Sequence, residues 1–97
     1  MNTQTSPEID VIEVLDESIA DVKLWSLVVF NDDVNTFDHV IDTLIEICEH
    51  NPQQAEQCAL IIHFKGKCGV KSGDQEELIT MRNAICDRGI SAEVMLK

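Results

Sequence analysis

Two groups of polar side chains carry the residue types needed to bind a charged amine. The first is the run Asn31-Asp32-Asp33 with Asn35 close behind it, and the second is His63. A protonated α-amine has three hydrogens to donate, and an amide oxygen of Asn31, a carboxylate oxygen of Asp32 and a ring nitrogen of His63 can accept them. Asp33 and Asn35 would then lie at the rim of the site. One interpretation is therefore a binding site for a free amino terminus.

A structural interpretation of the same residues stays open. Asn and Asp are typical of turns and helix caps because their short side chains bond to nearby backbone groups. A single His near the end of a helix more often packs or caps than binds a ligand. Local chemistry alone therefore favours a turn and a helix end over a binding site.

Metal binding is poorly supported by the spacing of possible ligands. Counted from Asn31, a calcium loop would need Gly where Thr36 stands and prefers Glu where Asp42 stands. The histidines lack the ligand spacing of a zinc site, and no Cys-x-x-Cys pair occurs. These residues are His39, His50, His63, Cys48, Cys58, Cys68 and Cys86. We expect no metal ion and no cofactor.

Catalytic motifs are also missing from the sequence. There is no Gly-rich phosphate loop, no nucleophile elbow and no dinucleotide fingerprint. Cys68 and His63 are close in sequence, but Cys68 lies in a strand pattern that should bury it, and a buried thiol is inert. We therefore expect that the chain is not an enzyme.

Composition narrows the class of partner. The net charge is -11 with only seven Lys and Arg residues, which argues against binding nucleic acid or an anionic membrane surface. An acidic surface suits a cationic partner such as a protonated peptide amine. No stretch approaches the ~18 apolar residues of a membrane span, and the first residues do not resemble a signal peptide. We expect a cytoplasmic protein.

Apolar periodicity and turn residues predict three strands and three helices. A strand over 24–30 ends at the Asn-Asp-Asp run, and Asn35 or Thr36 caps the helix that follows. The remaining expected elements are a helix from Asn51 to Gly66, a strand over 67–71, a helix from Ser72 or Asp74 to Gly89 and a strand over 92–96. The order β-α-α-β-α-β predicts an α+β fold, a compact two-layer sandwich with a three-stranded antiparallel sheet and three helices.

The chain divides into two parts by charge. Six of the 18 acidic residues lie within residues 1–23, where Lys23 is the only base. Such charge density without a clear helix cap predicts an acidic flexible tail over 1–23. The folded domain is expected to cover 24–97.

In this order, the segments resemble the signature of the Clp protease adaptor family, ClpS. The matching stretches are Val28 to Asp42, Gln54 to His63, and Lys67 to Val70. The resemblance implies an adaptor that recognises the free N-terminus and bulky hydrophobic first residue of a substrate, an N-degron. It also implies delivery to a Clp-type AAA+ unfoldase, ClpA- or ClpC-like, for proteolysis.

The resemblance also assigns roles by position. It gives the α-amine to Asn31, Asp32 and His63. It gives the first side chain to a hydrophobic pocket of Phe37, Val40, Ala59 and Ile62.

Three positions depart from the family pattern. Phe37 and Ala59 stand where Met is common, and Ile79 stands near where a Lys associated with docking on the unfoldase is expected. The alternative is a non-catalytic protein-docking module of the same fold that does not read N-termini.

Overall fold

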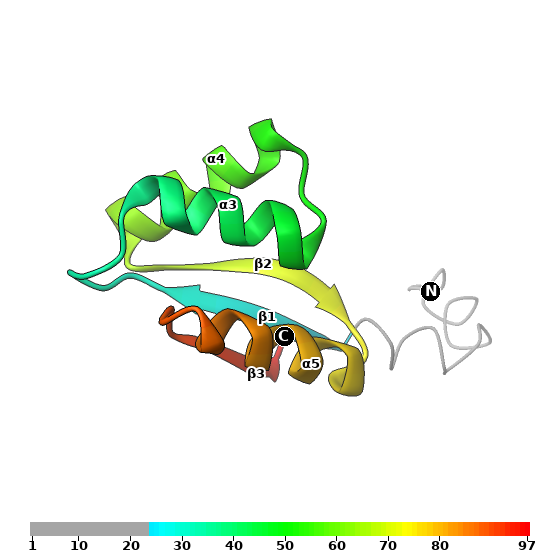
Figure 1. Ribbon diagram of the computed structural model, residues 1–97. Helices are drawn as coiled ribbons and strands as arrows, with labels where there is room; N and C mark the ends of the chain where they lie inside the picture. Colours follow the sequence, from blue (N-terminus) through cyan, green and yellow to red (C-terminus); the bar gives the residue numbers. More distant parts are fainter. Residues whose placement is uncertain (1–23) are drawn as a thin grey trace, which may run out of the picture.

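The computed structural model describes residues 24–97, so the tail predicted over 1–23 lies outside the described residues. The elements in chain order are β1 (Trp25–Phe30), α3 (Phe37–Cys48), α4 (Pro52–Lys65), β2 (Lys67–Gly73), α5 (Gln75–Asp87) and β3 (Ala92–Leu96) (Figure 1). This order of strands and helices confirms the prediction.

The three strands form one antiparallel sheet in the order β2-β1-β3. The central strand β1 pairs with both neighbours, and Val29 lies opposite Cys68 on one side and Ala92 on the other. On the β2 side, the register shifts between Leu27 and Val28. Because β1 is central, the loop that follows it leaves from the middle of the sheet.

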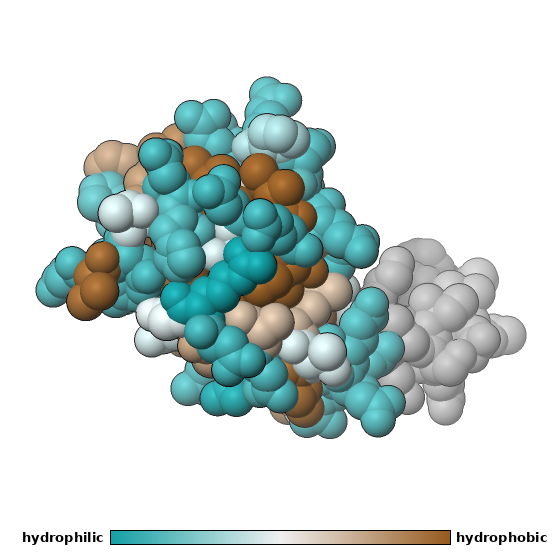
Figure 2. All heavy atoms as spheres, in the orientation of Figure 1, coloured by the Kyte–Doolittle hydropathy of each residue, from teal (hydrophilic) through white to brown (hydrophobic). Residues whose placement is uncertain are grey.

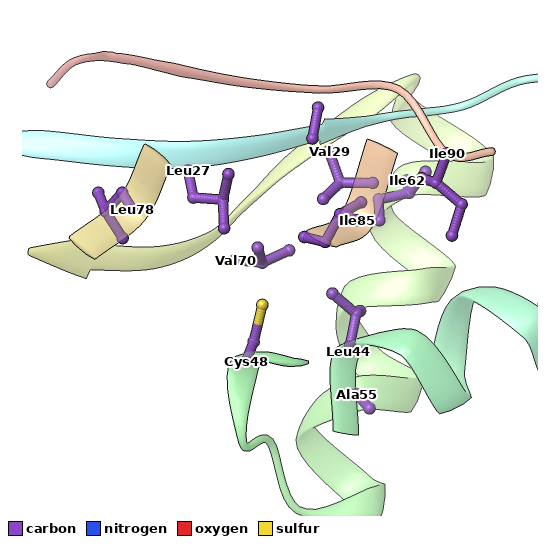
Figure 3. Packing of buried hydrophobic residues seen from close by; sticks show 11 residues of the cluster. Leu27, Val29, Leu44, Cys48, Ala55, Ile62, Val70, Leu78, Ile85 and Ile90 are labelled. Carbon is purple, nitrogen blue, oxygen red and sulfur yellow. The ribbon is translucent and has the colours of Figure 1, made fainter. Parts of the chain in front are cut away.

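One face of the sheet is covered by all three helices. Leu27 and Val29 alternate with outward residues of β1, so both point to the same face. They are buried in one cluster with side chains from each helix, including Leu44, Ile62 and Ile85 (Figure 3). Burying each large side chain contributes about 1.5–3 kcal/mol to stability. This shared core fixes α3 and α4 relative to β1, which is the arrangement on which the site depends.

Each helix begins at a polar cap. The side chains of Thr36, Asn51 and Asp74 accept hydrogen bonds from backbone N–H groups in the first turns of α3, α4 and α5. Such a cap contributes about 1 kcal/mol. The caps also decide two alternatives left open by the sequence, since Thr36 and Asp74 serve where Asn35 and Ser72 had been the other candidates.

One boundary differs from the sequence-based expectation. Strand β2 continues past Lys71 because Ser72 and Gly73 pair with Ser26 and Trp25 of β1. Helix α4 runs to Lys65 and is capped by Gly66, as the sequence predicted. Gly66 alone therefore separates α4 from β2, and its φ of 94° is a left-handed conformation that glycine adopts without strain.

The visible surface in Figure 2 is mainly hydrophilic, with hydrophobic side chains gathered in separate patches. None of the helices among residues 24–97 is long and apolar enough to span a lipid bilayer.

Candidate functional site

A pocket of about 580 Å³ opens between the loop after β1, the start of α3 and the second half of α4. Its size is typical of sites that bind small organic groups. The residues that line it are Asn31, Asp32, Asp33, Asn35, Thr36, Phe37, Val40, Ala59, Leu60, Ile62, His63 and Phe64. Every residue that the sequence analysis proposed for the amine site, the hydrophobic pocket or the rim lies on this wall.

A backbone hydrogen bond joins the two halves of the pocket. The N–H of Asn31 donates to the carbonyl of Gly66 at 2.9 Å. Asn31 is the first residue after β1, and Gly66 is the cap of α4, just beyond His63. This bond therefore places the polar loop beside the end of the helix that carries His63.

The carboxylate of Asp32 organises the loop around itself. Its Oδ1 accepts from the backbone N–H groups of Val34 (2.8 Å) and Asn35 (2.7 Å), and its Oδ2 accepts from Nδ2 of Asn35 (2.6 Å). The backbone N–H of Asn35 is the largest of the influences that hold the pKa of Asp32 below its ordinary value, although partial burial opposes them. The group is therefore ionised near neutral pH. A carboxylate has about four acceptor positions, so at least one remains for a further donor such as an ammonium group.

Asn35 links this loop to the turn between α5 and β3. Its Nδ2 donates to Asp32 and also to the carbonyl of Gly89 at 2.8 Å. The ring of His39 makes a second link, with Nε2 3.0 Å from the carbonyl oxygen of Arg88. Asn35 lines the pocket as the rim prediction required, but both amide hydrogens are engaged within the protein. Its side chain braces Asp32 and offers only its oxygen to a ligand.

The side chains of Asn31 and His63 are among the polar groups of the pocket that remain available for a ligand. Within residues 24–97, neither the amide of Asn31 nor the ring of His63 forms a side-chain hydrogen bond, and both residues are exposed. The ring of His63 meets the ring of Phe64 edge to face, with 4.9 Å between centroids and 78° between planes. Asn31, Asp32 and His63 therefore place an amide, a carboxylate and an imidazole around one opening.

The apolar part of the pocket has a buried floor and an exposed edge. Ala59 and Ile62 of α4 are 2% and 3% exposed, and Val40 of α3 is half-buried. Phe37, the first residue of α3, keeps 37% of its surface exposed at the mouth. The single methyl group of Ala59 leaves room above the floor that a longer side chain would fill.

Sequence reasoning had not placed Thr36, Leu60 or Phe64 in the pocket. Leu60 and Phe64 are four residues apart, so they share one side of α4. The signal that could have found Phe64 was Gly66 as the helix cap, because this cap keeps Phe64 on the helix beside His63.

The cysteines and the other histidines lie outside this pocket. All four cysteines are free, and burial is the main cause that raises the pKa of Cys48 and of Cys68 to about 11. Cys68 is only half-buried, less than its strand pattern predicted. Nε2 of His50 is 2.8 Å from the carbonyl oxygen of Val70. Among residues 24–97, no group of three or more His, Cys, Asp or Glu side chains is arranged to hold a metal ion.

Comparison with known proteins identifies a family model and relatives that share one description. The family model described as ATP-dependent Clp protease adaptor protein ClpS matches residues 20–94. The ClpS adapter protein of Campylobacter jejuni is 32% identical over 71 residues, which cover 71% of this chain and 72% of the relative. The Salmonella paratyphi B ClpS adapter protein is 26% identical over 80 residues, covering 76% of each chain.

A solved structure has the same fold. The structure of Agrobacterium tumefaciens ClpS2 bound to L-phenylalaninamide superposes with a TM-score of 0.74 at 16% sequence identity, covering 77% of this chain and 98% of that one. The family match spans the three helices, the whole pocket and all of the sheet except the last two residues of β3. The chain therefore belongs to the ClpS family of ATP-dependent Clp protease adaptor proteins.

Proposed function

We propose that the pocket binds the free N-terminus and bulky hydrophobic first residue of substrate proteins, so that the adaptor can deliver them to a Clp-type AAA+ unfoldase for proteolysis. The observation that carries this proposal is the meeting of three amine acceptors, on Asn31, Asp32 and His63, with an apolar floor in one pocket. An N-terminal residue presents both kinds of group on a single carbon atom. A pocket with both kinds of wall is complementary to it.

Binding would centre on a carboxylate that the chain already holds in place. Asp32, ionised and fixed by three hydrogen bonds, would accept one hydrogen of the α-ammonium group, and Asn31 and His63 would accept the others. The first side chain would lie against Ala59 and Ile62, with Phe37 at the mouth and Val40 on the α3 wall. Asp33 would add negative charge at the rim.

The expected affinity suits a transient carrier. Burial of one large side chain contributes about 1.5–3 kcal/mol, and each hydrogen bond to a charged group contributes about 1.5–3 kcal/mol. After the cost of ordering the peptide, roughly -7 to -9 kcal/mol remains, which corresponds to a Kd near micromolar. Such a complex releases its client readily.

The ligand in the Agrobacterium structure supports the proposal by its chemistry. L-phenylalaninamide, bound to ClpS2, carries a free α-amine and a phenyl side chain. It is thus a minimal version of the substrate terminus proposed here.

The partner is proposed to be a ClpA- or ClpC-like unfoldase in the cytoplasm, and the adaptor would perform no chemistry itself. The residue at the docking position, Ile79, is 41% exposed on α5. It lines a separate hollow with Gln75, Arg82, Glu93 and Val94. An apolar group at this place favours an unfoldase with an apolar contact opposite it.

Isothermal titration with a Phe-initiated peptide and its N-acetylated twin tests the amine site. We expect micromolar binding of the free peptide and loss of binding on acetylation, because acetylation removes the charge and two of the donors. Asp32→Asn removes one charge from the pocket and should weaken binding at least tenfold, the equivalent of about 1.5 kcal/mol or more. Asp38→Asn is the matched control, since Asp38 is exposed in the first turn of α3 and does not line the pocket.

Equal affinity for the free and acetylated peptides would contradict the proposal. If the chain instead bound a Clp unfoldase while reading no terminus, with Asp32→Asn unchanged, the protein-docking module would be the better description.

A further inference from the structure

Phe64 is a large apolar side chain at the pocket that neither accepts the proposed α-amine nor forms part of the pocket floor. Phe64 is 76% exposed although it lines the pocket, and it lies on the last turn of α4 directly after His63. An aromatic ring left in water contributes nothing to the core. Its position at a binding pocket makes it available for contact with a ligand.

The geometry of an extended peptide indicates which residue Phe64 can reach. Consecutive Cα atoms are about 3.8 Å apart, and consecutive side chains of an extended chain point to opposite sides. If the first side chain enters the pocket, the second must point away from the floor formed by Ala59 and Ile62. The centroid of the Phe64 ring is 4.9 Å from that of His63, which is close to one residue step from the proposed amine site.

The ring of Phe64 contacts His63 and leaves most of its own surface uncovered. It meets His63 edge to face at 78°, and the hydrogen bond between Asn31 N–H and the Gly66 carbonyl fixes the end of α4 beside the loop. The backbone that carries Phe64 is therefore already in place, and only its side chain has to be ordered when a ligand packs on it. A large apolar or aromatic partner gains most from such a surface.

We infer that Phe64 forms a second subsite that binds the side chain of the client's second residue and favours a large apolar or aromatic one. This inference rests on the proposed N-terminus binding and adds a preference at the next position. The adaptor would then recognise two residues of the client. The first side chain would be buried in the pocket, and the second would contact the exposed ring of Phe64.

Titration of four peptides tests the subsite. They begin Phe-Leu, Phe-Trp, Phe-Ser and acetyl-Phe-Leu and are otherwise identical. We expect the wild-type chain to bind Phe-Leu and Phe-Trp about three- to tenfold more tightly than Phe-Ser, in line with the worth of one aromatic or aliphatic contact. Phe64→Ala should reduce this ratio to near one while changing the affinity for Phe-Ser less than about twofold. Because Phe64 is exposed, the substitution removes little of the core.

Ile61→Ala serves as the matched control. Ile61 is also an exposed apolar side chain on α4, but it does not line the pocket, so the substitution should leave every peptide affinity unchanged.

The outcomes separate the two proposals. If none of the free-amine peptides binds, the proposed function fails. The subsite is refuted if the free-amine peptides bind with equal affinity whatever their second residue. It is also refuted if Phe64→Ala weakens all of them by the same factor. In both cases the proposed binding of the α-amine stands.

Discussion

Replacing Asn35 by alanine removes two side-chain hydrogen bonds while leaving Asn31, Asp32 and His63 themselves unchanged. One is the 2.6 Å bond to Oδ2 of Asp32, and the other is the 2.8 Å bond to the carbonyl of Gly89. A bond to a charged group contributes about 1.5–3 kcal/mol and one between neutral groups about 0.5–1.5 kcal/mol. Because Asn35 is only half-buried, water can replace part of both, and we expect the free energy of unfolding to fall by about 1–3 kcal/mol.

The same substitution should weaken amine binding by a smaller amount. The backbone N–H groups of Val34 and Asn35 still hold Oδ1 of Asp32, so the carboxylate stays in the loop but turns more freely. We expect affinity for a Phe-initiated peptide to fall about three- to tenfold, equivalent to roughly 0.7–1.4 kcal/mol. An acetylated peptide should show no difference between variant and wild type.

The pH dependence of peptide binding distinguishes the loss of the hydrogen bond from Asn35 to Asp32 from a general loss of structure. In the wild type, hydrogen bonds hold the pKa of Asp32 below its ordinary value. The stability they provide is therefore present above the unfolded-state pKa and is lost as the pH falls through the lower folded-state value. Without the side chain of Asn35, the pKa of Asp32 should rise, and amine binding should be lost at a higher pH on the acid side.

Peptide-binding titrations between about pH 3.5 and 6.5 would measure this loss of binding at acidic pH. Asn83→Ala is the control, since Asn83 is an exposed Asn on α5 whose side chain bonds to Arg82. An Asn35→Ala variant that folds, binds as tightly as wild type and loses binding at the same acidic pH would refute the proposed role of Asn35 in holding Asp32. If the alanine variant does not fold, Asn35→Ser retains a short donor and provides the same comparison.

Three further predictions concern the pocket floor, the helix cap and the thiols. Ala59→Met fills space above the buried floor, so affinity for a Trp-initiated peptide should fall more than affinity for a Leu-initiated one in the same titration. Equal losses would refute the idea that Ala59 leaves room for a large side chain. Gly66→Ala meets no atom within 4 Å, so its cost is the strain of a φ of 94°, about 1–2 kcal/mol, to be measured by denaturant unfolding; an unchanged midpoint would contradict this. With pKa values of about 11, Cys48 and Cys68 should react slowly with iodoacetamide near neutral pH, and mass spectrometry should find little labelling of either unless the fold opens.

Much of the fold was readable from local sequence patterns. The apolar positions of each helix recur at three and four residues, and Thr36, Asn51 and Gly66 are standard helix boundaries. The end of β2 was not readable, because Ser72 and Gly73 have low strand propensity and are held only by pairing with β1. That pairing is a tertiary effect with no local signal.

The site was predictable as a set of residues but not as an arrangement. Local chemistry and the resemblance to the family together named the candidates, and all of them line one pocket in the structure. Nothing in the sequence indicated that Asn35 bonds to the carbonyl of Gly89, since these residues are 54 positions apart. Nor did local patterns show that the loop after β1 is joined to the cap of α4.

That joint, between the N–H of Asn31 and the carbonyl of Gly66, is made by backbone atoms. Most side-chain substitutions at these positions leave both atoms present, so the alignment of the loop with α4 does not depend on which side chains line the pocket. The walls at Phe37 and Ala59 are free to vary during evolution, or by engineering, around a proposed amine site whose backbone framework keeps its geometry. A collection of variants at those positions would therefore be expected to differ in the termini they accept while sharing one requirement, a free α-amine.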